Sequence, residues 1–366
     1  MKYYIIAGEA SGDLHGSNLI KELRLLDANA DIRCWGGDKM QAAGGTLVKH
    51  YSQLAFMGFI EVIFNLRTIL KNIAFCKKDI EAYKPDILVL IDYPGFNLRI
   101  SEWAHTNNYK IAFYISPQVW AWKASRVKKM KQTIDKMLVI LPFEKAYYKN
   151  IWNWDVVYVG HPLVKVIEEA KESEKSKVKS QNTIAILPGS RKQEILKKLP
   201  VMLEVTKKYP AYNFVIAKAP GLTDAFYAPL LQPYNNVSTV SNQTYSLLAN
   251  ATAAMVTSGT ATLETALFGV PEVVCYKGNP ISYSIAKRLI KIKFISLVNL
   301  IMGKEVVKEL IQHNMNPVNL SAELNSLLHD ENKKQQLKKD YAALKQLLTQ
   351  GGDASANAAR EIYKMM

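Results

Sequence analysis

Short apolar runs alternate with stretches of helical periodicity along most of the chain. Several runs, such as Ile87–Ile91, are apolar throughout, which is typical of strands buried on both faces of a parallel sheet. Strands that alternate with helices form βαβ units, so the pattern predicts an α/β fold with two Rossmann-like domains on either side of a cleft. The predicted strands are Tyr3–Ala7, Ile32–Trp35, Ile87–Ile91, Ile111–Ile115, Met137–Leu141, Val156–Val159, Thr183–Leu187, Asn213–Ala217, Val237–Val240, Ala253–Val256 and Val273–Tyr276.

A change in composition marks the predicted domain boundary. Glu168–Asn182 contains Val178 as its only large apolar residue, so this segment cannot contribute to a core, and we interpret it as a solvated helix end and a linker. We therefore assign residues 1–165 to one domain and 166–345 to a second. Gly351 and Gly352 then separate the preceding helical pattern from a last helix within residues 346–366.

Composition narrows the class of protein. The 366 residues contain 47 Lys and Arg against 32 Asp and Glu, a net charge of +15, with an apolar content typical of globular proteins. No apolar stretch approaches the ~20 residues that span a bilayer, and the N-terminus lacks the apolar region of a signal peptide, so we expect a cytoplasmic protein. Cys34, Cys76 and Cys275 form no C-x-x-C pair, and the chain has no D-x-D triplet. We therefore expect no disulfide framework, metal site or bound cofactor.

Positive charge is concentrated in two regions, residues 123–136 and residues 277–308. Such patches attract nucleic acid, an anionic lipid surface or a phosphate-bearing substrate, although solvated helix faces have the same composition. The chain has no helix-turn-helix, RNP or zinc-finger motif, which argues against nucleic acid as the partner.

Carboxylates follow two predicted strands in the first half. Glu9 and Asp13 lie in the turn after the first strand, and Asp92 follows Ile87–Ile91 directly. Open α/β sheets bind ligands at these carboxyl ends, although turn-capping acids have the same pattern. The neighbouring Tyr93 and Phe96 should raise the pKa of Asp92 toward a value useful for a general base.

The next predicted strand leads into polar and aromatic residues. Ser116 and Gln118 are candidates for hydrogen bonds to sugar hydroxyls. Trp120 and Trp122 either stack on a sugar or belong to the core.

Two turns in the second half suit a diphosphate. Each places small residues and hydroxyls at the start of a helix, where backbone N–H groups and the helix dipole favour anions. A carboxylate one turn into the second helix is placed to accept the hydroxyls of a ribose. These residues are Gly189, Ser190 and Arg191 in the first turn and Ser258, Gly259, Thr260 and Glu264 in the second. Together they predict a site for a nucleoside diphosphate without a metal.

Seven motifs in this order resemble the lipid-A-disaccharide synthase family: GEASGDLHG, IDYPGFN, SPQVWAW, LPFEK, VGHP, LPGSRKQEI and SGTATLE. The resemblance covers nearly the whole chain. It implies an inverting glycosyltransferase of GT-B architecture in the lipid A pathway. Such an enzyme joins UDP-2,3-diacylglucosamine to 2,3-diacylglucosamine 1-phosphate (lipid X), forms a β-1,6-linked disaccharide 1-phosphate and releases UDP.

The resemblance also assigns roles. Asp92 matches the catalytic base that takes the proton of the acceptor's 6-hydroxyl, and Glu9 lies in the family's active-site loop; which of the two is the base stays open. Arg191, Glu264 and Asn299 match positions on the nucleotide side, although Val298 replaces the proline that usually precedes Asn299. We expect substrate contacts from Asp13, Asn97, Ser116 and Gln118.

The resemblance further implies peripheral association with the anionic cytoplasmic face of the inner membrane. The segment Leu54–Phe75 is either an interfacial, acyl-chain-receiving element or a core helix. By analogy with GT-B proteins the last helix packs back on the first domain, and a homodimer is compatible with the family. Alternatives are a peptidoglycan-type N-acetylglucosaminyl transferase, a UDP-sugar 2-epimerase and a catalytically silent membrane scaffold.

Overall fold

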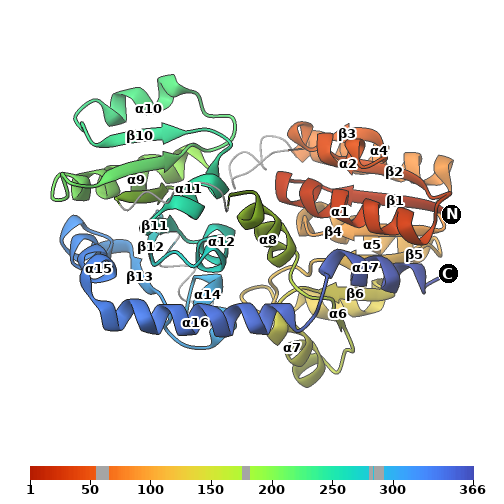
Figure 1. Ribbon diagram of the computed structural model, residues 1–366. Helices are drawn as coiled ribbons and strands as arrows, with labels where there is room; N and C mark the ends of the chain where they lie inside the picture. The colour runs from red at the N-terminus through yellow and green to blue at the C-terminus, as the bar shows by residue number, and fades with distance from the viewer. Residues whose placement is uncertain (55–65, 175–181, 280–282, 284–291) are drawn as a thin grey trace. The chain divides into compact units, whose positions relative to one another are not determined.

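The computed structural model describes residues 1–54, 66–174, 182–279, 283 and 292–366. The chain forms two compact units (Figure 1). Unit 1 comprises Met1–Pro162 together with Leu348–Met366, and unit 2 comprises Leu163–Leu347. In the sequence, unit 2 is therefore inserted into unit 1.

Unit 1 is built on a parallel sheet of seven strands in the order β3-β2-β1-β4-β5-β6-β7. Its strands are β1 (Lys2–Ala7), β2 (Asp31–Gly36), β3 (Thr46–His50), β4 (Ile87–Ile91), β5 (Lys110–Tyr114), β6 (Lys136–Val139) and β7 (Val157–Tyr158). Its helices are α1 (Ala10–Leu26), α2 (Asp38–Ala42), α4 (Leu66–Tyr83), α5 (Pro94–Thr106), α6 (Arg126–Thr133), α7 (Pro142–Trp152) and α17 (Ala354–Tyr363).

The strands of unit 1 bury alternate residues on opposite faces of the sheet. Tyr4 and Ile6 of β1 pack in one cluster, with Ile73 and Ile80 of α4 and with residues of α5 and α6. Tyr3, Ile5 and Ala7 point to the other cluster, with residues of α1 and α17. This two-residue period explains why the buried strands are continuous apolar runs.

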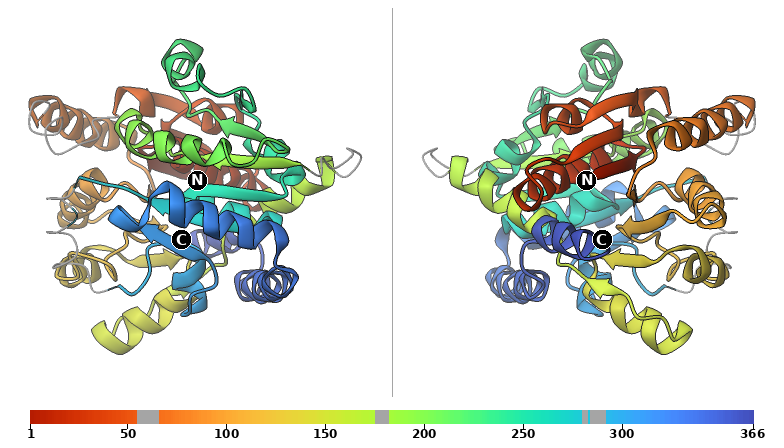
Figure 2. Two further views of the ribbon diagram at one scale, coloured as in Figure 1. Left: turned by 90° about the vertical axis from the view of Figure 1, so that its left-hand side faces the viewer. Right: turned by 90° about the vertical axis from the view of Figure 1, so that its right-hand side faces the viewer.

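The last helix, α17, belongs to the core of unit 1. Ala358, Ala359 and Ile362 are fully buried against residues of α1 and β1. In the right-hand view of Figure 2 the dark blue last helix lies beside the red first helix. Gly160 and Gly351 approach so closely that a Cβ on Gly351 would overlap the Gly160 backbone.

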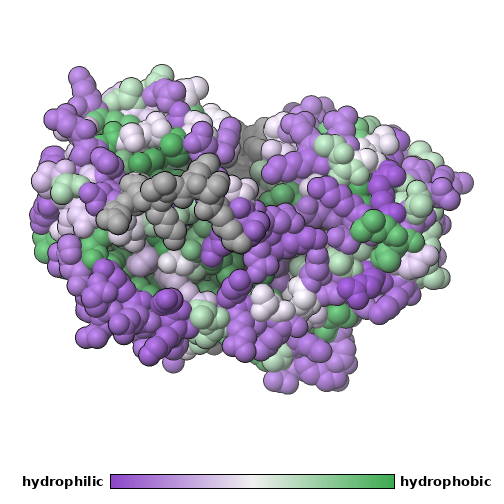
Figure 3. Space-filling model, viewed as in Figure 1, coloured by the Kyte–Doolittle hydropathy of each residue, from purple (hydrophilic) through white to green (hydrophobic). Residues whose placement is uncertain are grey.

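Unit 2 is built on a parallel sheet of six strands in the order β10-β9-β8-β11-β12-β13. Its strands are β8 (Thr183–Leu187), β9 (Asn213–Ala217), β10 (Val237–Val240), β11 (Ala253–Thr257), β12 (Glu272–Tyr276) and β13 (Lys308–Ile311). Its helices are α8 (Leu163–Glu174), α9 (Lys192–Thr206), α10 (Asp224–Leu231), α11 (Thr244–Asn250), α12 (Thr260–Phe268), α14 (Leu297–Met302), α15 (Pro317–His329) and α16 (Glu331–Thr349), whose last two residues belong to unit 1. In Figure 3 hydrophilic residues cover the part of α16 at the lower left, in keeping with its many lysines and glutamines.

The predicted α/β class with two Rossmann-like parallel sheets is confirmed. Two strands were missing from the prediction. β3 and β13 lie at sheet edges, and both are short and partly exposed, with charged residues among the apolar ones. Edge strands of this kind lack the continuous apolar run that identifies a buried strand.

Two segments of the sequence analysis fall partly outside the described residues. Of the predicted linker, residues 168–174 belong to α8, and residues 175–181 lie outside the described residues. Of Leu54–Phe75, residues 55–65 lie outside them. In the remainder, Ile73 of α4 packs in the core, whereas Leu70 and Phe75 are about half exposed, at 52% and 47%.

Candidate functional sites

The first candidate site lies in unit 1 at the carboxyl ends of β1 and β4. The chain leaves β1 toward one end of the sheet and reaches β4 on the other side of β1, so this pair is the topological switch point, where open α/β sheets bind ligands. Glu9 follows β1, and Asp92 follows β4. The register aligns Ala7 with Ile91, so the two carboxylate-bearing turns begin at the same level of the sheet.

The turn after β4 is tight and left-handed. Asp92 and Tyr93 have φ values of 43° and 49°, a region that residues other than glycine seldom occupy. A Cβ at Gly8 would overlap the Tyr93 ring, so the absence of a side chain at Gly8 lets the ring close over the β1 turn. Ile115, at the exit of the adjacent β5, has a φ of 67°. Residues with a strained backbone therefore lie together at the carboxyl ends of β4 and β5, as they do at many functional sites.

Burial dominates the electrostatics of Asp92. Burial and, to a smaller extent, the negative charge of Glu9 together raise the pKa of the carboxyl group to about 6, whereas a hydrogen bond from the Tyr93 backbone opposes the rise. A carboxyl group with this pKa is mostly ionised at neutral pH and still basic enough to accept a proton from a hydroxyl in a transition state.

Asn97 stabilises the turn after β4 through hydrogen bonds to its backbone. It is fully buried, and its Nδ2 donates to the carbonyl oxygens of Asp92 at 2.8 Å and Ile91 at 3.2 Å. The Asn97 side chain therefore fixes the backbone that presents Asp92, and its predicted substrate contact stays a prediction.

Asp13 has a structural role in unit 1, and its predicted substrate contact stays a prediction. Its carboxylate is 3% exposed and accepts the backbone N–H groups of Gly37 at 2.7 Å, Met40 at 3.0 Å and Lys39 at 3.2 Å. These are N–H groups at the start of α2, which have no partner within the helix. Asp13 therefore ties α1 to α2.

The loop after β5 contains one buried and one exposed candidate. Ser116 is buried; its hydroxyl donates to the Pro117 carbonyl and shares a hydrogen bond of 2.5 Å with the Tyr148 hydroxyl. These bonds fix the Ser116 hydroxyl within the loop, and its predicted sugar contact stays a prediction. Gln118 is exposed, with its side chain at the surface of this loop. Trp122 is 49% exposed and lies beside Lys123 and Arg126, while Trp120 packs edge-on against Phe143.

Glu144 lies against the loop after β5, and the sequence analysis did not name it as a candidate residue. It is 1% exposed on α7, accepts the Leu141 and Ile140 N–H groups, and accepts the indole N–H of Trp120 at 3.2 Å. Burial raises its pKa to about 7, with a small contribution from Asp92. The motif LPFEK indicates this role, because Pro142 is the first residue of the helix and Glu144 is the third, the position that closes a capping box.

The second candidate site lies in unit 2 at the carboxyl ends of β8 and β11, which form the switch point of that sheet. Gly189, in the first turn, has a φ of 112°, and Gly259, in the second, has a φ of 153°. The Thr257 hydroxyl donates to the Pro188 carbonyl at 3.1 Å and holds the two turns together. The turns lead into α9 and α12, and the first N–H groups of such helices favour anions.

Arg191, the N-cap residue of α9, is the first of three charged side chains that form successive ion pairs. Its guanidinium lies 3.3 Å from Glu194, which in turn lies 3.6 Å from the buried ammonium of Lys198. Arg191 itself is 60% exposed, so it can reach a ligand. Ser190 and Thr260 are also exposed, whereas the Ser258 hydroxyl is bonded to the Ile295 carbonyl at 2.8 Å. Ser258 therefore shapes the turn, and Arg191, Ser190 and Thr260 face solvent.

Glu264 lies one turn into α12 and accepts a hydrogen bond from the Tyr245 hydroxyl at 3.1 Å. Burial raises its pKa. Among the described residues, no hydrogen bond engages its other carboxylate oxygen, and the ribose contact of Glu264 stays a prediction.

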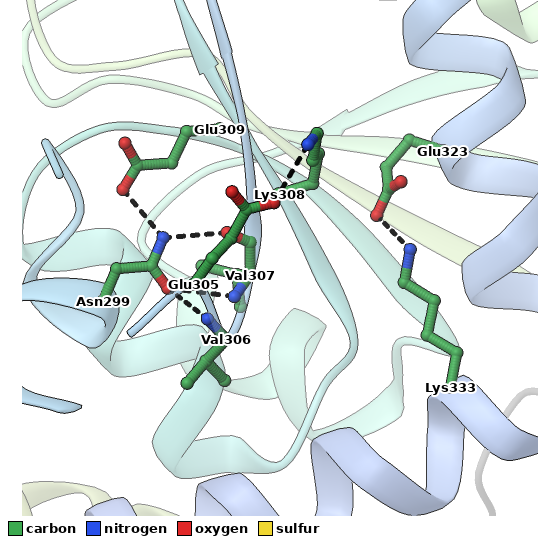
Figure 4. Close-up of polar contacts among 8 residues, drawn as sticks. All are labelled: Asn299, Glu305, Val306, Val307, Lys308, Glu309, Glu323 and Lys333. Carbon is green, nitrogen blue, oxygen red and sulfur yellow. Dashed lines mark hydrogen bonds and ion pairs between the residues drawn. The ribbon is translucent and has the colours of Figure 1, made fainter. Parts of the chain in front are cut away.

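The Asn299 side chain forms hydrogen bonds within unit 2 (Figure 4). Its Oδ1 accepts the N–H groups of Val306 and Val307, and its Nδ2 donates to the Val307 carbonyl and to Glu309. Two donors and two acceptor positions exhaust the amide. Asn299 is fully buried and fixes the segment between α14 and β13, and these contacts give no support to the predicted nucleotide contact, which stays a prediction.

Residues 3–363 match the sequence model of a family described as lipid-A-disaccharide synthetase. The chain belongs to the lipid-A-disaccharide synthase family. It is 38% identical to the lipid-A-disaccharide synthase of Geobacter metallireducens, over 99% of this chain and 96% of the relative. It is 36% identical to lipid-A-disaccharide synthase 1 of Legionella pneumophila strain Paris, over 94% of this chain and 92% of the relative. The protein is thus a glycosyltransferase of lipid A biosynthesis.

Solved structures support the fold of this family member. The UDP-GlcNAc 2-epimerase of Neisseria meningitidis bound to UDP-GlcNAc matches with a TM-score of 0.69 and 14% identity, over 100% of this chain and 99% of that chain. The calicheamicin glycosyltransferase CalG4 matches with a TM-score of 0.58 and 14% identity, over 100% and 97%. These likenesses establish the GT-B architecture.

Two features are absent from the described part of this synthase-family chain. Within it, no three or more His, Cys, Asp or Glu side chains are grouped to hold a metal ion. Nor does any helix in that part combine the length and apolar character needed to cross a membrane.

Proposed function

We propose that the protein transfers 2,3-diacylglucosamine from its UDP derivative to the 6-hydroxyl of 2,3-diacylglucosamine 1-phosphate. The observation that carries the proposal is the Asp92 carboxyl group at the switch point of unit 1, with a pKa of about 6. A transferase needs such a base because an alcohol is a weak nucleophile until its proton is removed.

The proposed reaction is one displacement. The 6-oxygen of the acceptor attacks the anomeric carbon of the donor as its proton passes to the Asp92 carboxylate. The bond between that carbon and the diphosphate oxygen breaks, and the electron pair leaves with UDP. Attack from the opposite side inverts the anomeric centre and produces the β linkage. Asn97 holds the backbone of Asp92 during this step through its hydrogen bond to the carbonyl.

Unit 2 carries the groups proposed for the departing UDP. The N-terminal N–H groups of α9 and α12 and the guanidinium of Arg191 offer positive charge to the diphosphate, a role that many transferases give to a metal ion. The free oxygen of Glu264 is proposed to accept a ribose hydroxyl. We therefore propose that the reaction needs no metal.

We also propose peripheral binding to an anionic membrane surface. On α4, the exposed Leu70 and Phe75 lie on the same helix as the exposed Arg67 and Lys71. This combination of apolar and basic side chains is typical of interfacial helices, and the net charge of +15 adds attraction to anionic lipids.

The test is to incubate the purified protein with both proposed substrates and to follow disaccharide and UDP by mass spectrometry, with and without EDTA. We expect both products in equal amounts, and EDTA should not reduce them. Parallel reactions contain unacylated UDP-GlcNAc as the donor. Product from the unacylated donor alone would contradict the proposal in favour of another UDP-sugar enzyme, and failure with every donor would favour a silent scaffold.

A further inference from the structure

A pocket of about 420 Å³ opens between α5 and α6 in unit 1. Its size lies within the range of ~300–1,000 Å³ that is usual for small-molecule sites. Pro94, Gly95 and Leu98 of α5 form one wall, and Met130 and Thr133 of α6 contribute to the other. All the residues that line it belong to unit 1.

Three basic side chains line this pocket: Arg99, Arg126 and Lys129. One acidic side chain, Glu102, also lines it and is bound to Lys129 at 2.7 Å. Among the residues that the structure describes, no carboxylate lies within ion-pair distance of Arg99 or Arg126. Two guanidinium groups are therefore available for an anion, and Arg126 is positioned by contact with the Trp122 ring.

The helix geometry adds to this preference. Both helices begin beside the pocket, α5 at Pro94 and α6 at Arg126, and the side chain of Ser125 at the N-cap of α6 makes no capping bond. The first N–H groups of each helix favour negative charge. An arginine pair beside two helix N-termini suits a phosphate monoester, which accepts several charge-assisted hydrogen bonds.

The pocket also lies next to the candidate base. Pro94, in its wall, is two residues from Asp92, and both belong to the turn after β4. In the proposed acceptor, the 6-hydroxyl and the 1-phosphate are attached to one sugar ring. We therefore expect an acceptor whose phosphate is bound between α5 and α6 to place its 6-hydroxyl near the Asp92 carboxylate.

We propose that the pocket between α5 and α6 binds the phosphate monoester of the glycolipid acceptor through Arg99 and Arg126. This inference rests on the proposed function, since it assigns the acceptor's phosphate to a place in unit 1. A phosphate monoester is also presented by the head group of phosphatidic acid, so the experiment has to separate the two sources.

The variants are Arg99→Gln and Arg126→Gln, with Lys128→Ala as the matched control. Lys128 is an exposed base on α6 that does not line the pocket. Each protein is assayed with lipid X and with the same diacylglucosamine lacking the 1-phosphate. We expect each arginine variant to raise KM for lipid X about tenfold or more, the usual effect of losing a charge-assisted hydrogen bond. KM for the UDP donor should not change.

The phosphate-free acceptor provides the decisive comparison. Wild type should use it poorly, and the arginine variants should use it as wild type does, because the lost partner is the phosphate itself. Equal losses with both acceptors would overturn the proposal. If the variants bind phosphatidic acid vesicles less well while KM for lipid X stays unchanged, the pocket holds a phospholipid head group and the proposal is wrong. An inactive wild type would refute the proposed function instead.

Discussion

The two units have sheets with the same strand order and yet place different chemistry at the same topological position. Numbered within its own sheet, each order begins 3-2-1-4-5-6, and each candidate site lies between strands 1 and 4. In unit 1 this position holds Glu9 and Asp92, and in unit 2 it holds two glycine turns that lead into helices. The fold determines where the ligand site lies. The residues of the turns determine whether that site suits proton transfer or anion binding.

The difference extends to the way each unit treats charge. In unit 1 a carboxyl group is buried at a cost, and its pKa rises to about 6. In unit 2 the exposed Arg191 and the helix N-termini leave positive charge open to solvent. Burial raises the pKa of a proton acceptor in unit 1, whereas in unit 2 an exposed guanidinium lies at the turn where a diphosphate is proposed to bind.

The largest effect should come from Asp92→Asn. Removing the base while keeping the shape should lower kcat by ~10²-fold or more, with little change in KM for the donor. Steady-state kinetics with both substrates measure this. A variant that retains wild-type kcat would assign the base elsewhere, with Glu9 the first alternative.

A smaller effect, confined to the nucleotide, is expected for Arg191→Ala. Losing its charge-assisted bonds should weaken UDP binding about tenfold, as measured by calorimetry. Lys197→Ala is the control, because Lys197 is an exposed base on the same helix, away from the turn. Equal weakening in both variants would mean that only the general charge of α9 matters.

The pH profile of kcat/KM distinguishes the two carboxylates of unit 1. Activity should fall as the pH drops through about 6, because Asp92 becomes protonated. Glu9 raises the pKa of Asp92, so Glu9→Gln should move this acid limb to lower pH by less than about one unit, burial being the larger cause. Abolished activity at every pH would instead identify Glu9 as the base.

The smallest effect concerns stability. The pKa of Asp92 is higher in the folded protein than its ordinary value of 3.8, so its ionised form destabilises the fold at neutral pH. Asp92→Asn should increase the free energy of unfolding at pH 7 by about 1 kcal/mol or more. The gain should shrink as the pH falls from 6 toward 4, where wild type also becomes neutral. Denaturant unfolding at several pH values tests this; an unchanged gain at pH 4 would point to packing rather than charge.

Much of the fold could be predicted because buried parallel strands are continuous apolar runs. Ile87–Ile91 was predicted with the bounds that the structure has. The edge strands β3 and β13 could not be, because their pairing on one side only leaves charged residues such as Lys49 and Glu309 among the apolar ones. Pairing with a distant strand, rather than local pattern, decides such segments.

The candidate site was predictable by residue type and not by contact. A carboxylate after a strand could be recognised in Asp92 and Asp13 alike. The sequence could not show that Asp13 is saturated by backbone N–H groups of α2, more than twenty residues away. The same limit applies to Asn299, whose partners include Glu309. Whether a polar side chain is free for a ligand depends on tertiary contacts that have no local signature.

The position of α17 determines the order in which the chain can fold as it leaves the ribosome. Unit 2 is complete once Leu347 has been synthesised, whereas the core of unit 1 still lacks Ala358, Ala359 and Ile362. The first 162 residues therefore emerge early with one face of their sheet still partly uncovered. A nascent chain stalled before α17 should contain a protease-resistant unit 2 and a protease-sensitive unit 1. Synthesis of α17 then completes the core of unit 1, whose first strands were made earliest.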